Sequence, residues 1–235
     1  MFHPRGPTFS ELARQALSST RRGYDLLAPK FDFTPFRTPD FILDAVAPHL
    51  PRVDRSLDVC CGTGAGVRIL KPVTRRLVVG IDFSDGMLAE AKRAAPALPG
   101  PAVVAFVRGD ARAMPFDGAF GLATCFGALG HFVGNDQELF LSAIARSLAP
   151  GGVFAFVTGG PITPASPGWW LARGFNAAMH VRNALLKPEF IMFYLTFMLP
   201  EVLAQLDRHG LAPEVRALEL PRPISRLKLV LATRR

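Results

Sequence analysis

The sequence has few of the residues that stabilise small secreted proteins or span membranes. Cysteine occurs three times, as Cys60, Cys61 and Cys125. Two of them are adjacent, a spacing that suits neither an ordinary structural disulfide nor a four-ligand zinc site. No apolar segment of secretory type follows the first basic residue, and the longest apolar stretch, 190–199, is shorter than the roughly 20 residues of a spanning helix. We therefore expect a cytoplasmic protein with no metal site.

Acidic residues are also scarce, at 19 against 27 Lys and Arg. Residues 158–235 hold 10 basic and 5 acidic side chains, more than half of the formal excess of +8. This bias could attract an anionic substrate, a membrane surface or RNA, and it equally describes a solvated basic face. Since 49% of the 235 residues are hydrophobic, the chain can bury a large core.

Short apolar runs alternate with helical patterns through the middle of the chain, which is typical of a parallel sheet covered by helices on both faces. Helices are expected at 10–22 and at 39–49, the second with Thr38 as its cap and Pro39 as its first residue. A hairpin between the last two predicted strands would make the last strand antiparallel. The predicted strands are 56–60, 77–81, 103–107, 119–126, 153–158, 211–220 and 227–233.

Glycines and carboxylates occur where these strands end. Gly62, Gly64 and Gly66 follow the first strand, and Asp82 ends the second strand 20 positions after Gly62. Glycines let the backbone approach a ligand closely, and an acid at that distance can accept hydrogen bonds from two ribose hydroxyls. An NAD enzyme would fit the same two features. In the glycine motif of an NAD enzyme, however, the last glycine lies one position later than it does here. In addition, Asp110 ends the third strand, where a carboxylate can receive an adenine amino group.

With these residues in place, the chain resembles the class I S-adenosylmethionine-dependent methyltransferases, in particular the small-molecule branch similar to the ubiquinone and menaquinone biosynthesis methyltransferases. The segments similar to the family's motifs are 57–64 (LDVCCGTG), 80–88 (GIDFSDGML), 109–111 (GDA) with 114–116 (MPF), and 148–152 (LAPGG). One departure is Cys60, where many members have glycine. The resemblance implies a Rossmann-like seven-stranded, mostly parallel sheet with helices on both faces.

The resemblance also divides the chain and assigns its cofactor site. The predicted single domain has an N-terminal helical cap at 1–54, a cofactor-binding core at 55–158, a helical lid insertion at 159–199 and the end of the core at 200–235. S-adenosylmethionine is the implied cofactor and S-adenosylhomocysteine the product. The loop from Asp58 to Gly64 would hold the methionine end of the cofactor. The implied cofactor-binding residues are Tyr24, Asp58, Cys60, Gly62, Thr63, Gly64, Asp82, Phe83, Met87, Asp110, Ala111 and Cys125.

The acceptor side is less specific. His131 follows the fourth strand and titrates in the range of a general base, so it is the candidate catalytic residue; a structural or pocket-lining histidine is the alternative. His180 and Arg182 could meet a carboxylate or phenolate. Aromatic residues of the insertion could form a flat substrate wall, or merely pack the insertion or a dimer interface. The candidate substrate residues are Phe126, His131, Trp169, Trp170, Phe193 and Tyr194.

We therefore expect an enzyme that methylates an oxygen, carbon or nitrogen atom of a hydrophobic or aromatic small molecule in biosynthesis. The alternatives are an RNA methyltransferase, suggested by the basic last third, and a non-catalytic binding module of the same fold. Nucleic acid is not favoured, because no Asn/Asp-Pro-Pro-aromatic element follows the fourth strand and no RNA-binding domain is evident. Peripheral contact with a membrane and a homodimer both stay open.

Overall fold

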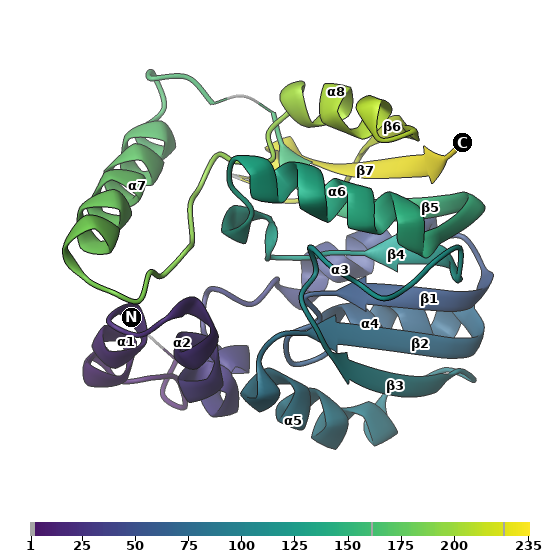
Figure 1. Cartoon of the computed structure of the whole chain (residues 1–235), viewed down its shortest axis with the longest axis horizontal. Helices are drawn as coiled ribbons and strands as arrows, with labels where there is room; N and C mark the ends of the chain where they lie inside the picture. Colours follow the sequence, from purple (N-terminus) through teal and green to yellow (C-terminus); the bar gives the residue numbers. More distant parts are fainter. Residues whose placement is uncertain (1–2, 161, 223) are drawn as a thin grey trace.

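The computed structural model describes residues 3–160, 162–222 and 224–235. Within these residues, seven strands form one sheet in the order β3-β2-β1-β4-β5-β7-β6 (Figure 1). Strands β1 to β5 pair in parallel, and β7 runs antiparallel to both β5 and β6. The predicted seven-stranded α/β class with an antiparallel last strand is therefore confirmed. The strands are β1 Val53–Val59, β2 Thr74–Asp82, β3 Val103–Arg108, β4 Phe120–Thr124, β5 Leu148–Gly159, β6 Leu211–Ala217 and β7 Leu227–Arg234.

Helices cover both faces of the sheet, because successive residues of a strand point to opposite sides. Val79 and Ile81 face the layer formed by α6 and α8, where Phe140 is fully buried. Val78 faces the other layer, formed by α3, α4 and α5, where Leu70 is fully buried. These helices are α3 Asp40–Val46, α4 Ala65–Leu70, α5 Asp85–Ala94, α6 Asn135–Ser147 and α8 Glu201–Arg208.

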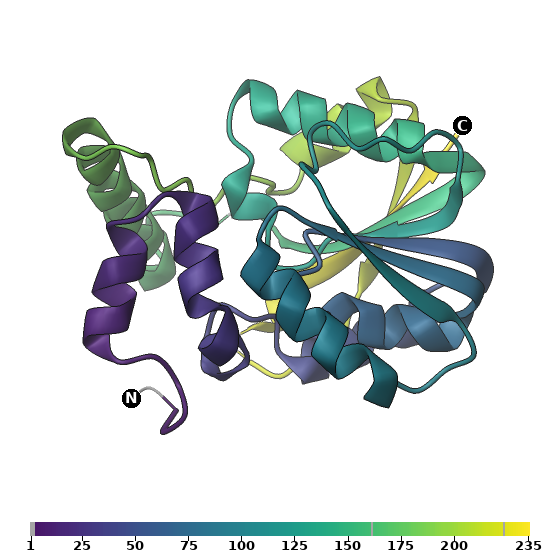
Figure 2. The same ribbon diagram turned by 60° about the horizontal axis from the view of Figure 1, so that its bottom comes forward.

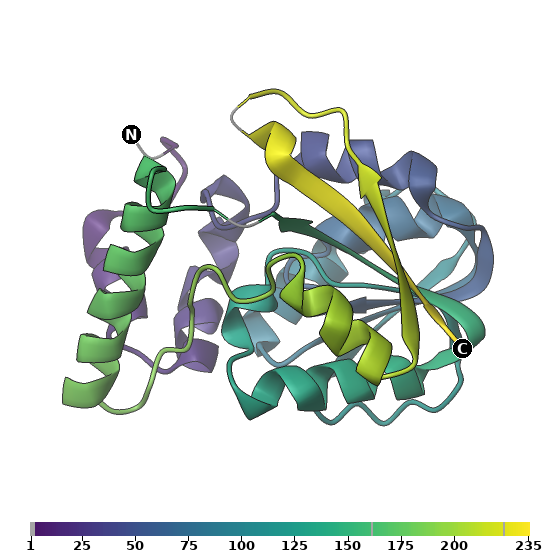
Figure 3. The ribbon, with the colours of Figure 1, turned by 90° about the horizontal axis from the view of Figure 1, so that it is seen from above.

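A third group of helices lies beyond the carboxyl ends of the parallel strands. It consists of α1 Phe9–Ala16, α2 Thr20–Leu27 and α7 Pro167–Leu185, which we call the three-helix cap. All three views show α7 beside α1 and α2 although some 140 residues separate them in the sequence (Figures 1, 2 and 3). Arg182 of α7 joins them, since its guanidinium donates to the carbonyl oxygens of Ala16 and Ser18, each at 2.9 Å.

Two details of the N-terminal prediction are wrong. The single helix expected at 10–22 is two helices, because the Ser19 hydroxyl accepts a hydrogen bond from the Arg22 N–H and starts α2 as a cap residue. Thr38 does not cap α3. Pro39 occupies the cap position in extended conformation, and Asp40 is the first helical residue.

Candidate active site

A cavity of about 230 Å³ opens at the carboxyl ends of β1, β2 and β4. This is the edge of a parallel sheet where loops converge and ligands bind. The turn after β1 forms its floor: Gly62 has a φ of 52° and Gly64 a φ of 95°, both in the left-handed region open to glycine. Cys60 has a φ of 55°. Its conformation agrees with the glycine that many members of the resembled family have at this position.

The carboxylate of Asp82, at the end of β2, is hydrogen-bonded to the backbone of that turn. Its Oδ2 accepts a hydrogen bond from the Gly62 N–H at 2.9 Å, and its Oδ1 accepts one from the Ser84 N–H, also at 2.9 Å. Burial raises its pKa, and these backbone N–H groups oppose the rise. Asp82 lines the cavity, and a carboxylate at this place can accept hydrogen bonds from a diol.

Asp58 at the base of the same turn has an unsatisfied atom. Its Oδ1 accepts a hydrogen bond from the Thr124 hydroxyl at 2.8 Å. Its Oδ2 is buried and has no partner among the described residues. Burial raises the pKa of Asp58 to about 7. A buried acceptor without a hydrogen-bond donor is costly, and the backbone of Gly66 and Val67 at the start of α4 lies against this carboxylate and opposes the rise in its pKa.

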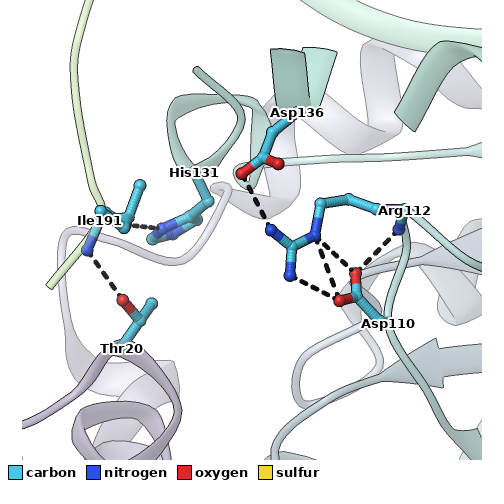
Figure 4. A network of polar contacts seen from close by, with 6 residues as sticks. All are labelled: Thr20, Asp110, Arg112, His131, Asp136 and Ile191. Carbon is cyan, nitrogen blue, oxygen red and sulfur yellow. Dashed lines mark hydrogen bonds and ion pairs between the residues drawn. The ribbon is translucent and has the colours of Figure 1, made fainter. Parts of the chain in front are cut away.

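A guanidinium links the two sides of the cavity mouth (Figure 4). Arg112 donates to both oxygens of Asp110, the shortest contact being 2.6 Å, and to Asp136 at the start of α6, at 2.9 Å. The hydrogen bonds from Arg112, together with its charge, lower the pKa of Asp110. The carboxylate predicted to meet an adenine amino group is thus charged, and it shares its oxygens with Arg112.

His131 connects three distant segments of the chain. Its Nε2 lies 2.8 Å from the Tyr24 hydroxyl, and its Nδ1 contacts the carbonyl oxygen of Ile191 in the strap, residues 186–199 after α7 (Figure 4). Because a carbonyl oxygen only accepts, Nδ1 carries the hydrogen, and Nε2 accepts from Tyr24. Burial lowers the pKa of His131 and raises that of Tyr24. The ring is therefore neutral and the phenol protonated at neutral pH.

The cavity gathers most, but not all, of the predicted site residues. The structure brings together Tyr24, Asp58, Cys60, Gly62, Thr63, Asp82, Phe83, Met87, Asp110, Ala111, Phe126 and His131. Gly64 and Cys125 lie outside the lining: Gly64 is the cap residue of α4, and Cys125 is buried in the core.

The aromatic residues of the insertion do not form the expected wall. Trp170 is 63% exposed and donates to the carbonyl oxygen of Pro164. Trp169 packs edge-on against it. Phe193 is buried against His180, and Tyr194 contacts Phe175. These contacts agree with the alternative interpretation, in which the aromatic side chains pack the insertion itself.

The polar predictions for the insertion also fail in part. Arg182 does not face the cavity, because its guanidinium donates to main-chain carbonyl oxygens of the cap. Cavity residues that the sequence analysis missed come from segments without a motif. They are Thr20, Phe31, Phe36, Arg37, Thr38, Arg112, Asp136 and Ile191, among others. The aromatic run between Phe31 and Phe36 is the one signal that could have pointed to them.

Strand order, glycine turn and the acid after β2 are those that the resemblance to the class I S-adenosylmethionine-dependent methyltransferases implies. Residues 57–152 match the family described as methyltransferase domain. Over 100 residues, the chain is 42% identical to the demethylmenaquinone methyltransferase of Thermus thermophilus, covering 42% of this chain and 44% of that protein.

Two further proteins are similar. Over 103 residues, the chain is 37% identical to the 2-phytyl-1,4-naphtoquinone methyltransferase of Synechococcus elongatus, covering 42% of each. The chain thus spans less than half the length of these curated relatives. Among solved structures, DhpI in complex with SAH superposes with a TM-score of 0.64 at 20% identity, covering 96% of this chain and 98% of that one. That likeness shows the fold.

Proposed function

We propose that the protein transfers the methyl group of S-adenosylmethionine to an oxygen, carbon or nitrogen atom of a hydrophobic aromatic small molecule of the quinone class. The observation that carries this proposal is the buried Asp82 carboxylate hydrogen-bonded to the Gly62 N–H inside the cavity. The names of the relatives, which are quinone methyltransferases, support the acceptor class.

The cavity residues fit this cofactor. Asp82 would hold the ribose hydroxyls, and Asp110 with the Ala111 backbone the adenine. The unpartnered Oδ2 of Asp58 would accept from the ammonium group of the methionine end, which supplies the positive charge that this buried carboxylate lacks. Tyr24 would close the cavity from above. S-adenosylmethionine supplies an electrophilic methyl group on a sulfonium centre.

The protein's own part in the reaction is alignment, exclusion of water and movement of one proton. Phe36, Phe126 and Phe132 give the cavity an apolar wall for the acceptor. Where the acceptor is a phenol or quinol, His131 Nε2 takes the proton of the Tyr24 hydroxyl while that hydroxyl takes the proton of the acceptor. The neutral, Nδ1-protonated tautomer fixed by Ile191 is the one able to do this.

The other candidates and partners have less support. No specific observation favours an RNA methyltransferase or a non-catalytic module, since the site retains every implied cofactor residue except Gly64 and Cys125 in its lining. No helix among the described residues has the length and apolarity needed to cross a membrane. The proposal includes a peripheral membrane contact, through which a lipophilic acceptor would reach the cavity. A homodimer remains a sequence prediction.

Calorimetric titration with S-adenosylmethionine and S-adenosylhomocysteine tests the cofactor. The wild type should bind both at micromolar concentration. Asp82→Ala should weaken binding by about 10²–10⁴-fold, because two hydrogen bonds to a charged group, each worth about 1.5–3 kcal/mol, are lost. Asp54→Ala is the matched control, since Asp54 pairs with Arg75 on the surface at the other end of β1. A wild type that binds neither compound would refute the proposal.

A further inference from the structure

The outward side of α7 is apolar over its whole length. Ala172 and Met179 are buried on its inner side. The outer face carries apolar residues and one glycine, all exposed, at helical spacing. At 100° per residue they cover about 140° of the circumference without a polar interruption. The members of this outer face are Trp170, Leu171, Gly174, Ala177, Ala178, Val181, Ala184 and Leu185.

This face is unusual for a helix in contact with water. Leu171 is 78% exposed, Leu185 77% and Trp170 63%. Leu17, which directly follows α1, is 61% exposed on the segment that Arg182 joins to α7. Contiguous apolar surface of this kind marks a site of contact with a protein or a membrane. Burial of the outer face therefore requires an occupant outside the described chain.

The cap around this face is positively charged. Residues 3–27 and 162–199 contain seven basic and three acidic side chains. All three acids are already engaged within the protein. They contact the following partners: Glu11 pairs with Lys30, Asp25 accepts from the Ser84 hydroxyl, and Glu189 pairs with Lys187.

The cations, in contrast, are mostly free. Arg14, Arg21, Arg22 and Arg173 are exposed and take part in none of the ion pairs found among the described residues. Three of them lie in the α1–α2 segment that is joined to α7. An apolar helix face on a cap that carries exposed guanidinium groups outside ion pairs has the composition of a surface that lies in the headgroup region of a lipid bilayer.

We propose that the outer face of α7 docks on an anionic lipid bilayer, with the arginines of the cap against the headgroups. A second copy of the chain is the weaker occupant, because a two-fold contact through this face would bring the same net positive charge from both protomers together. The strap leads from α7 to Ile191 in the cavity wall. Given the proposed function, docking would bring a lipophilic acceptor to the mouth of the cavity.

Co-sedimentation of the full chain with vesicles tests this surface. The protein should bind vesicles of phosphatidylglycerol with phosphatidylcholine, bind phosphatidylcholine alone about tenfold or more weakly, and detach as salt increases. Leu171→Glu with Val181→Glu should weaken binding about tenfold or more. The matched control is Val103→Glu with Leu139→Glu, which places the same charges on two exposed apolar residues of β3 and α6.

A second readout comes from the two tryptophans of the chain, Trp169 and Trp170, which both start α7. Their fluorescence should shift to the blue with anionic vesicles and be quenched by bromine-labelled lipid chains, in the wild type and in the control. Absence of vesicle binding, or equal binding by Leu171→Glu/Val181→Glu, would overturn the proposal. So would a wild-type dimer that this variant converts to a monomer, because the occupant would then be a second copy.

The outcome is separable from that of the proposed function. Vesicle binding needs neither cofactor nor acceptor, so it can succeed when calorimetry finds no cofactor binding. Conversely, Leu171→Glu/Val181→Glu should bind S-adenosylhomocysteine as the wild type does, because neither residue lines the cavity. Unchanged cofactor binding also shows that the variant is folded.

Discussion

The hydrogen bond between Tyr24 and His131 joins the two residues best placed to handle a proton. His131 is neutral at rest, because burial lowers its pKa and the Ile191 carbonyl fixes its tautomer. A base that must be neutral loses activity as pH falls through its pKa. The rate of methyl transfer should therefore fall only below the usual range of histidine, near pH 6.5.

His131→Asn and Tyr24→Phe test this role. Both should lower kcat about 10²–10⁴-fold for an acceptor that must lose a proton, and the acid limb of the pH–rate profile should disappear in His131→Asn. Cofactor affinity, measured by calorimetry, should change little for His131→Asn. A variant that loses activity but keeps the wild-type acid limb would show that His131 only holds the strap in place.

Arg182 shows how one side chain holds a whole element. Its guanidinium donates to carbonyl oxygens of Ala16, Ser18 and Pro188, and so ties α7 to the α1–α2 junction and to the strap. Arg182→Ala should speed amide hydrogen exchange in α1 and in the strap about 10-fold or more, because charge-assisted hydrogen bonds worth about 1.5–3 kcal/mol each are lost. Hydrogen exchange with mass spectrometry measures this change.

Arg173→Ala is the control on the same helix, since Arg173 lies over the Trp169 ring and makes none of these bonds. Exchange in α6 and in the sheet should stay as in the wild type for both variants. Equal exchange in Arg182→Ala and Arg173→Ala would mean that the three-helix cap is held by its apolar contacts instead.

Elements were predictable from sequence where local signals decide them. The helix after β2 begins at a residue type that favours the cap position, since the Ser84 hydroxyl accepts a hydrogen bond from the Met87 N–H. Strand ends were less accurate: β5 was expected at 153–158 and runs over Leu148–Gly159. Leu148 pairs with Phe120 ahead of an irregularity in the ladder, and Gly159 still pairs with Leu227. The break between α1 and α2 was missed although Ser19 is a good cap residue.

That most of the proposed cofactor residues line one cavity was predictable for the same reason. Asp58 and Asp82 lie at the carboxyl ends of β1 and β2, and Asp110 follows β3, each within a short motif. The acceptor side depends on tertiary packing: Thr20 and Ile191 meet through the hydrogen bond from the Ile191 N–H to the Thr20 hydroxyl, 171 positions apart. The sequence left open that Arg182 could meet a carboxylate or phenolate, because its main-chain carbonyl partners leave no trace in the side-chain pattern.

The free energy of unfolding of the whole protein should depend on the protonation of Asp58. Its pKa is about 7 in the folded protein and about 4 in an unfolded chain. Between these values the folded state binds more protons, so stability falls as pH rises from 4 to 7. Between pH 5 and pH 8, this single carboxyl should lower the free energy of unfolding of the cofactor-free protein by about 2–3 kcal/mol.

Asp58→Asn removes this titration. Urea unfolding should show the stability of the variant rising relative to the wild type by about 2–3 kcal/mol from pH 5 to pH 8. The cofactor should reverse the difference, because the variant lacks the carboxylate that would meet its ammonium group. Asp44→Asn, at an exposed ion pair with Arg68, is the control. Parallel stability curves for wild type and Asp58→Asn would contradict the assignment.

The three-way junction at His131 also has a consequence for folding. The glycine turn and Asp82 are near neighbours in sequence, 20 positions apart, and can form early. The junction instead closes loops of 107 and 60 residues, to Tyr24 and to Ile191. Because the chain entropy of long loops is lost only when distant segments meet, the acceptor half of the site should assemble last and open first. Molecules in which only the acceptor half is unfolded would then still bind the cofactor but would be inactive.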